Sequence, residues 1–205
     1  RFGIKRVVVS SYQSASGAGA AAMDELGAQI LAVIHEQHVE PKAFAHQIAF
    51  NCIPHIGGFK EDGYTSEEQK IIEESRKLLG LPNLRITATA VRVPTLSCHG
   101  EAVTVEFERQ VDVALARDAL RAHPGVIVQD EPAHAVYPMG AVAPGDRVEA
   151  ATGRDAVYVG RIRRDESVDS GLCFWVVSDN LRKGAALNAV QIGERILQAL
   201  RSKST

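Results

Sequence analysis

The sequence has few cysteines and no large excess of either charge. Its three cysteines, Cys52, Cys98 and Cys173, are odd in number and lie far apart in 205 residues. This pattern excludes the disulfide framework of small secreted proteins and favours the reducing cytoplasm. The formal net charge is −2, so the chain lacks the concentrated basic face that nucleic-acid binders need. We therefore expect any bound anion to be small and no nucleic acid among the partners.

Long apolar runs and an initiator methionine are also missing. No apolar run reaches the roughly 18 residues that a membrane-spanning helix needs, and the N-terminus lacks the layout of a signal peptide, so no membrane partner is expected. The chain begins at Arg1 and passes almost directly into the apolar run at 7–9. This beginning indicates a cut through a longer protein. With 45% hydrophobic residues, the chain can still bury a core as one domain.

Hydrophobic spacing predicts more strands than helices. Helices are expected at about 20–37, 67–79, 113–122 and 183–200, and strands at 6–12, 47–56, 84–95, 102–111, 126–129, 158–163 and 172–178. The segment 131–154, rich in proline and glycine, is expected to be a long loop. Because strands and helices do not alternate regularly, the pattern predicts an α+β fold. Its sheet should be mixed, largely antiparallel and covered by helices, rather than doubly wound.

Capping residues mark the ends of the helix at 67–79. Thr65 and Ser66 each have an acidic or amide residue three positions on, so either one has the capping-box spacing. Gly80 follows the predicted helix at the position where helices commonly end with a residue in the left-handed conformation. The last helix, at 183–200, is instead apolar nearly all round. That pattern predicts burial on more than one side, against a partner that this sequence does not contain.

Glu67 and Lys70 lie three residues apart in the first turn of a predicted helix, so both project from one face. A pocket could use the pair to hold an ammonium group and an anion. On spacing alone, however, an exposed ion pair worth a few tenths of a kcal/mol is the commoner interpretation.

Arg92 and His99 lie seven residues apart on a strand-like run. An arginine inside an apolar strand pattern is costly to bury unless it is paired, and its planar fork suits a carboxylate. An internal ion pair or an edge position is the structural alternative. His99 precedes Gly100, titrates near neutrality and suits acid/base chemistry, although a lone histidine beside a turn is more often structural or exposed.

Three other patterns are weaker. His35 and His38 resemble a ligand pair, but no third ligand stands at a sensible spacing, so no metal site is predicted. Cys98 is next to His99, but neighbours along a strand point to opposite faces, so it is not proposed as a nucleophile. The small-residue run at 17–22 follows a strand and opens a helix, as in dinucleotide-binding proteins. Without regular strand and helix alternation, a tight turn is favoured.

Four motifs occur in the order expected of a known family. They are SYQSASGAG at 11–19, EEQK at 67–70, RVPTLSCH at 92–99 and SDNLRKGAA at 178–186. Together they closely resemble the aspartate-semialdehyde dehydrogenase family, nearly end to end, but only over the second half of that enzyme.

The resemblance implies a division of the chain into two parts. Residues 1–178 would form a substrate-binding and dimerisation domain similar to that of glyceraldehyde-3-phosphate dehydrogenase. Residues 179–205 would form a C-terminal helix that returns to a Rossmann coenzyme domain absent from this sequence. The implied partner chain is a second copy, which makes a homodimer.

The resemblance also assigns roles to five polar residues. Arg92 would hold the α-carboxylate of the substrate, Glu67 its amino group and Lys70 its phosphate. Gln13 would orient the substrate, and His99 would be the acid/base group; these two are the implied catalytic residues. A guanidinium matches a carboxylate bidentately, and a compact ammonium suits phosphate. The family often has Gly-His-Ser where this chain has Cys-His-Gly at 98–100.

For the coenzyme, the resemblance implies NADP, with Asn180 near the nicotinamide and Ser16 and Gly17 beside it. The catalytic cysteine of the family lies in an Asn-Pro-Asn-Cys-like segment that would precede Arg1. The implied reaction is the reductive dephosphorylation of β-aspartyl phosphate to aspartate β-semialdehyde, with release of phosphate, in the cytoplasmic synthesis of lysine, threonine, methionine and isoleucine. Without the thiolate, the chain alone is expected to be inactive.

Two alternatives remain open at this point. The chain could be a non-catalytic dimerisation fragment. It could also belong to a sister acyl-phosphate reductase, such as one acting on an acyl-glutamyl phosphate. The pairing of Glu67 with Lys70 argues against that second case, because a carboxylate that recognises a free amine has no use for an N-acylated substrate.

Overall fold

A six-stranded mixed sheet lies at the centre of the molecule, in the strand order β2-β1-β3-β6-β5-β4. The computed structural model describes residues 2–202. The strands are β1 (Ile4–Gln13), β2 (Arg85–Arg92), β3 (His99–Phe107), β4 (Val126–Val128), β5 (Val157–Arg164) and β6 (Gly171–Ser178). The pairs β1/β2 and β4/β5 are parallel, and the other three pairs are antiparallel. The predicted α+β fold with a largely antiparallel sheet is confirmed.

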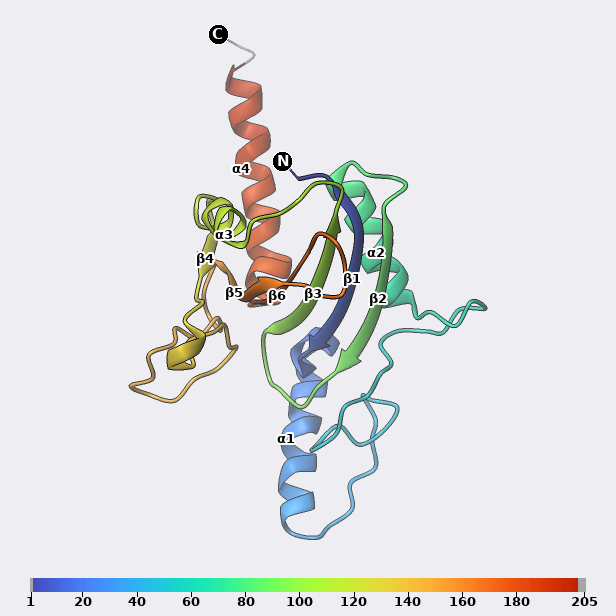
Figure 1. Ribbon diagram of the computed structural model, residues 1–205. Helices are drawn as coiled ribbons and strands as arrows, with labels where there is room; N and C mark the ends of the chain where they lie inside the picture. The colour runs from blue at the N-terminus through green and yellow to red at the C-terminus, as the bar shows by residue number, and fades with distance from the viewer. Residues whose placement is uncertain (1, 203–205) are drawn as a thin grey trace.

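Residues 2–202 contain four α-helices: α1 (Ala20–Ile34), α2 (Ser66–Leu79), α3 (Val113–Arg121) and α4 (Leu187–Ser202). Shorter helical segments occupy Ala15–Ala18 (η1), Pro132–His134 (η2) and Arg182–Ala186 (η3). Helix α2 packs on β2, and α3 packs on β4 and β5. Figure 1 shows α1 extending from one end of the sheet and α4 from the other.

The capping prediction for α2 is confirmed, and Thr65 is the N-cap. The Thr65 hydroxyl accepts from the Glu68 backbone N–H at 3.3 Å, while the Glu68 carboxylate accepts from the Thr65 N–H at 2.7 Å. Gly80 ends the helix with φ 64°, a left-handed conformation that glycine adopts without strain. The Glu68 carboxylate also accepts from the Ala90 N–H at 3.0 Å, so the cap fixes the start of α2 against β2.

The predicted strand at 47–56 is wrong. Within the described residues this segment makes only one isolated bridge, between Ile53 and Arg92. Its backbone N–H groups at Ile48 and Ala49 donate instead to the Gln29 side chain of α1, at 2.8 and 3.2 Å. The buried apolar residues of the segment therefore pack against a helix, and apolar content alone does not distinguish that arrangement from a strand.

The strand-like run expected to hold both Arg92 and His99 is also wrong. Strand β2 ends at Arg92, and β3 begins at His99. The chain reverses through residues 93–98, where Pro94 has no N–H for a strand ladder and Cys98 adopts φ 68°. The two site residues therefore stand on different strands, and the alternation argument used for Cys98 does not apply to it.

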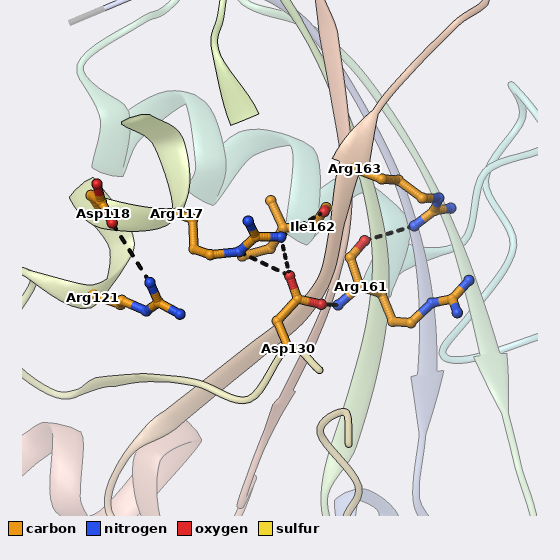
Figure 2. Close-up of polar contacts among 7 residues, drawn as sticks. All are labelled: Arg117, Asp118, Arg121, Asp130, Arg161, Ile162 and Arg163. Atoms are coloured by element: carbon orange, nitrogen blue, oxygen red, sulfur yellow. Dashed lines mark hydrogen bonds and ion pairs between the residues drawn. The ribbon is translucent and has the colours of Figure 1, made fainter. Parts of the chain in front are cut away.

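A buried ion pair joins α3 to the sheet edge. Arg117 donates to the Asp130 carboxylate from Nε at 3.1 Å and from Nη2 at 2.6 Å, and Nη2 also reaches the Ile162 carbonyl at 3.3 Å. The other Asp130 oxygen accepts from the Arg161 backbone N–H at 2.7 Å. Figure 2 shows Asp130 between these donors. The carboxylate is fully buried, and its charge is balanced by the guanidinium, which donates twice to one of its oxygens.

The last helix begins later than predicted, at Leu187, after the wide turn of η3. None of the α4 residues, all of which the structure describes, is buried, and apolar residues including Val190, Ile196 and Leu200 are more than half exposed. The expected burial on more than one side is therefore not found here. Arg1 and residues 203–205, which belong to the predicted parts 1–178 and 179–205, lie outside the described residues. No helix in 2–202 is long and apolar enough to cross a membrane.

Candidate functional site

Three predicted site residues stand in one row across the sheet. Strand β1 lies between β2 and β3, and Gln13 at its end pairs in register with Arg92 on one side and His99 on the other. Directly opposite residues in neighbouring strands present their side chains to the same face. The row therefore places a guanidinium, an amide and an imidazole side by side, although the sequence separates them by many residues.

Arg92 is buried, with 7% of its surface exposed. Its Nη1 donates to the Ser14 carbonyl at 2.7 Å, and it has no ion pair among residues 2–202. Burial lowers the pKa of the guanidinium, and the Glu67 carboxylate partly offsets this by raising it. A guanidinium has five N–H donors, so most of them remain free for a ligand. Arg92 also lines a cavity of about 260 Å³ beside residues 43–45 and 53–57, which can admit a small carboxylate.

Glu67 and Lys70, in the first turn of α2, reach the same row. Gln13 donates through Nε2 to Glu67 Oε1 at 3.2 Å, and Lys70 Nζ lies 3.7 Å from Glu67 Oε2. The Lys70 side chain is 56% exposed, so the pair alone contributes little to stability. Glu67 is nevertheless more than one half of an exposed ion pair, because its hydrogen bond with Gln13 links α2 to the row of Gln13, Arg92 and His99.

His99 is held by Ser14 through its Nδ1. The Ser14 backbone N–H donates to this nitrogen at 3.1 Å, and the Ser14 hydroxyl lies 3.3 Å from it. The N–H donor favours the neutral tautomer with its proton on Nε2, whereas the hydroxyl can accept from Nδ1–H in the other tautomer. Ser14 therefore gives His99 a partner in either state, so Nε2 can donate or accept.

Burial is the main cause that lowers the pKa of His99. The hydrogen bond with the Cys98 backbone raises this pKa, and the nearby charge of Arg92 lowers it. The Glu67 carboxylate and the Lys70 ammonium also act on it, in opposite directions. Because the net effect is a lowering caused mainly by burial, the neutral imidazole is favoured near pH 7.

Asn180, just beyond β6, ties the turn after β1 to the loop before β3. Its Oδ1 accepts from the Ser16 hydroxyl at 3.1 Å, the Ser14 hydroxyl at 3.3 Å and the Cys98 N–H at 3.0 Å. Its Nδ2 donates to Ser16 at 3.0 Å. Asp179 fixes the backbone beside it by accepting from the Gly153 N–H at 2.7 Å. Ser16 and Asn180 therefore fix the turn after β1 against the loop before β3.

Gly17 brings its backbone close to Arg92 and His99. A Cβ at this position would lie 2.9 Å from Arg92 Nη1 and 3.2 Å from His99 Nε2, so any side chain would crowd both groups. Of the three residues predicted to contact the coenzyme, Gly17 can do so directly, while the hydroxyl of Ser16 is buried and engaged by Asn180.

Two residues at the site were missed in the sequence. Ser14 holds both Arg92 and His99, and Asp179 accepts backbone N–H groups at the start of η3. Each follows immediately after a strand that ends at the site, and this position is the sequence feature that could have identified them.

Within residues 2–202, no group of three or more His, Cys, Asp or Glu side chains could hold a metal ion. Burial raises the pKa of the Cys98 thiol, which disfavours a thiolate.

Comparison with known proteins identifies relatives over almost the whole chain. The family described as "semialdehyde dehydrogenase, dimerisation domain" matches residues 1–183. Aspartate-semialdehyde dehydrogenase of Aquifex aeolicus is 48% identical over 198 residues, which cover 96% of this chain and 56% of that protein. The Bacillus subtilis enzyme of the same name is 42% identical over 95% of this chain and 56% of its own length.

A solved structure shares the fold as well. Aspartate semialdehyde dehydrogenase II of Vibrio cholerae, complexed with ASA, superimposes with a TM-score of 0.87 at 41% identity, over 96% of this chain and 56% of that one. The chain thus spans about half the length of the curated relatives it matches. These matches do not favour either alternative, a non-catalytic dimerisation fragment or a sister acyl-phosphate reductase. The chain belongs to the semialdehyde dehydrogenase dimerisation-domain family, and its resemblance to the aspartate-semialdehyde dehydrogenases is confirmed.

Proposed function

We propose that this chain forms the substrate-binding half of an NADP-dependent aspartate-semialdehyde dehydrogenase. The proposed reaction is the reduction of β-aspartyl phosphate to L-aspartate β-semialdehyde with release of phosphate. The observation that carries the proposal is Arg92, a buried guanidinium without an ion-pair partner among the described residues, which stands in one row with Gln13 and His99. A buried charge of this kind is costly unless a ligand pairs with it.

Each charged group of the substrate has a matching residue. Arg92 binds the α-carboxylate with two parallel N–H donors, and Glu67 binds the ammonium group. Lys70, the most exposed of the three, meets the phosphate as a point charge from the solvent side. Gln13 contacts Glu67 and lies beside Arg92, so it orients the substrate between the two.

His99 acts at the reacting carbonyl group through Nε2. In the neutral tautomer favoured by the Ser14 N–H, Nε2–H donates a hydrogen bond to the carbonyl oxygen as negative charge develops there. In the other tautomer, the Ser14 hydroxyl accepts a hydrogen bond from Nδ1–H, and the unprotonated Nε2 can take a proton from a reacting group. The nucleophilic cysteine is supplied by the part of the enzyme outside this sequence, and the chain alone does not turn over.

The coenzyme is expected beside Gly17, where a side chain would crowd Arg92 and His99. NADP supplies or accepts the hydride when it is bound. Ser16 and Asn180 hold the turn that contains Gly17. They therefore support the nicotinamide end of the coenzyme, and the coenzyme domain makes the other contacts. Helix α4 extends toward the coenzyme domain, and its exposed apolar residues pack on that domain. The enzyme is proposed to be a cytoplasmic homodimer in the synthesis of lysine, threonine, methionine and isoleucine.

Calorimetric binding of a phosphonate analogue of β-aspartyl phosphate tests the substrate assignment. The wild-type chain should bind the analogue, and Arg92→Leu should weaken binding by about 10- to 100-fold, because a charge-assisted hydrogen bond contributes about 1.5–3 kcal/mol. Arg85→Leu is the matched control, since Arg85 lies on the same strand but is exposed at its far end. Equal affinities of wild type and Arg92→Leu, or no binding by the wild type, would contradict the proposal.

A further inference from the structure

His55 lines the same cavity as Arg92. The cavity has a volume of about 260 Å³, and the rest of its lining comes from small and apolar residues at 18, 43–45, 53, 56 and 57. Sites for drug-sized ligands measure roughly 300–1,000 Å³, so this cavity suits a group of few atoms. Among the described residues that line it, only Arg92 and His55 have titratable side chains. A ligand group enclosed there therefore meets a guanidinium and an imidazole.

The segment that carries His55 is held at both ends. At its start, Ile53 and Arg92 exchange two backbone hydrogen bonds: the Ile53 N–H donates at 2.9 Å and the Arg92 N–H at 2.8 Å. At its end, the Ser66 N–H donates to the Gly58 carbonyl at 2.9 Å, and the Gly58 N–H donates to the Ser66 hydroxyl at 3.2 Å. His55 is therefore fixed between the end of β2 and the first turn of α2, which are the two elements that supply the proposed substrate-binding charges.

Phe59 holds the plane of the His55 ring. The two rings are stacked, with centroids 4.4 Å apart and an interplanar angle of 13°. The Phe59 backbone forms an isolated bridge with Thr65, the N-cap of α2, which anchors the stack. Stacking leaves the ring nitrogens unused, and neither nitrogen of His55 has a hydrogen-bond partner within residues 2–202. An imidazole with a free donor is therefore held in the wall of the cavity.

We propose that His55 donates a hydrogen bond to the same α-carboxylate that Arg92 binds, and so helps to select substrates that have this group. The inference rests on the proposed function, which places the carboxylate at Arg92. A carboxylate has about four lone-pair sites, and a bidentate guanidinium uses two of them. An imidazole N–H takes a third. The neutral ring has one N–H and the protonated ring has two, so His55 is a donor in both states.

Calorimetry with the phosphonate analogue of β-aspartyl phosphate tests the contact. His55→Leu should weaken binding about tenfold, as expected when a hydrogen bond to a charged group is lost. His55→Gln should recover most of this loss, because its amide also has N–H donors. His46→Leu is the matched control: His46 is an exposed histidine between α1 and α2 that does not line the cavity, and its replacement should leave the affinity unchanged. Circular dichroism checks that each variant is folded.

A second ligand separates a direct contact from general support of the segment. It is the same phosphonate with a hydrogen in place of the α-carboxylate, and its affinity is measured by NMR titration. Wild type and His55→Leu should bind this ligand equally, because it has no acceptor for the lost donor. Equal losses for both ligands in His55→Leu would indicate a structural role and overturn the inference.

The inference and the proposed function fail in different ways. If Arg92→Leu weakens binding of the analogue but His55→Leu does not, the role of His55 is wrong and the proposed substrate stands. If the wild-type chain does not bind the analogue at all, the proposed substrate is wrong, and the role of His55 is wrong with it.

Discussion

Arg92 is buried and Arg117 is partly buried, but their guanidinium groups have different partners. Arg117 is bound by the buried Asp130 carboxylate through two donors and by the Ile162 carbonyl through a third contact (Figure 2). Arg92 is the more buried of the two, yet it has one backbone carbonyl, that of Ser14, as its hydrogen-bond acceptor within the described residues.

The difference supports the proposal that Arg117 is a structural arginine and Arg92 a binding one. A buried charge that is fully paired can serve stability, whereas a buried charge with free donors lacks compensation until a ligand arrives. The Glu67 carboxylate is near enough to Arg92 to affect its pKa, but it is engaged by Gln13 and Lys70 instead. Burial together with an unused donor set, rather than burial alone, is what supports the proposed role of Arg92.

The largest expected effect comes from Asp130→Ala, which leaves Arg117 without its carboxylate. The free energy of unfolding should fall by about 3 kcal/mol, the lower end of the range for a broken buried pair, because Arg117 keeps some contact with water. Urea denaturation measures this loss. Affinity for the phosphonate analogue should not change under conditions where the variant is folded, and a large loss of affinity would contradict the separation of the two arginines.

Arg92→Leu should show the opposite pattern. Affinity for the analogue should fall by about 1.5–3 kcal/mol, whereas the free energy of unfolding should change by less than about 1 kcal/mol or increase, because an uncompensated buried charge is removed. Calorimetry and urea denaturation are the two measurements. Arg117→Leu is the matched comparison and should lose stability without losing affinity. If Arg92→Leu and Arg117→Leu both lost mainly stability, or both lost mainly affinity, the distinction between a binding and a structural arginine would be wrong.

Thr65→Ala should have an intermediate effect on both properties. Loss of the cap hydroxyl is expected to lower the free energy of unfolding by about 1 kcal/mol. Because the cap positions Glu67 at the site, a modest loss of analogue affinity should accompany it. Ser66→Ala is the control, since the Ser66 hydroxyl accepts from Gly58 rather than capping α2. An unchanged affinity in Thr65→Ala would indicate that Glu67 is placed by other contacts.

The smallest effect expected is the pH dependence caused by His99. Its folded pKa lies below the ordinary value of 6.5, so the unfolded chain binds more protons between the two values. Stability from this group is therefore fully present above about pH 6.5 and is lost as the pH falls toward the folded pKa. NMR titration should give a His99 pKa below the ordinary value of 6.5. His99→Gln should lose less stability than wild type between pH 7.5 and 5.5.

Parts of the fold and site could be predicted because their signals are local. The Thr65 cap, the helix end at Gly80 and the alternating pattern of β3 depend on residues a few positions apart. Arg92 was detectable because a charge inside an apolar strand pattern is costly. The segment at 47–56 could not be predicted correctly, because its backbone donors are satisfied by a distant side chain, Gln29.

Other features depend on contacts between remote parts of the chain. Ser14 supports both Arg92 and His99 only because β1 lies between β2 and β3. The role of Asn180 likewise requires the end of β6 to meet the turn after β1. No short motif determines which strands become neighbours, since pairing is set by the whole core.

The sequence by itself determined the fold class, most helices and strands, and the identity of the groups proposed to bind the substrate. Only the tertiary structure decided that Gln13, Arg92 and His99 stand in one row and that Arg92 lacks a carboxylate partner among residues 2–202. It also decided that Asn180 holds the Cys98 N–H beside the site. The physical reason is that composition and spacing act within a segment, whereas desolvation and pairing of a charge depend on which segments the fold brings together.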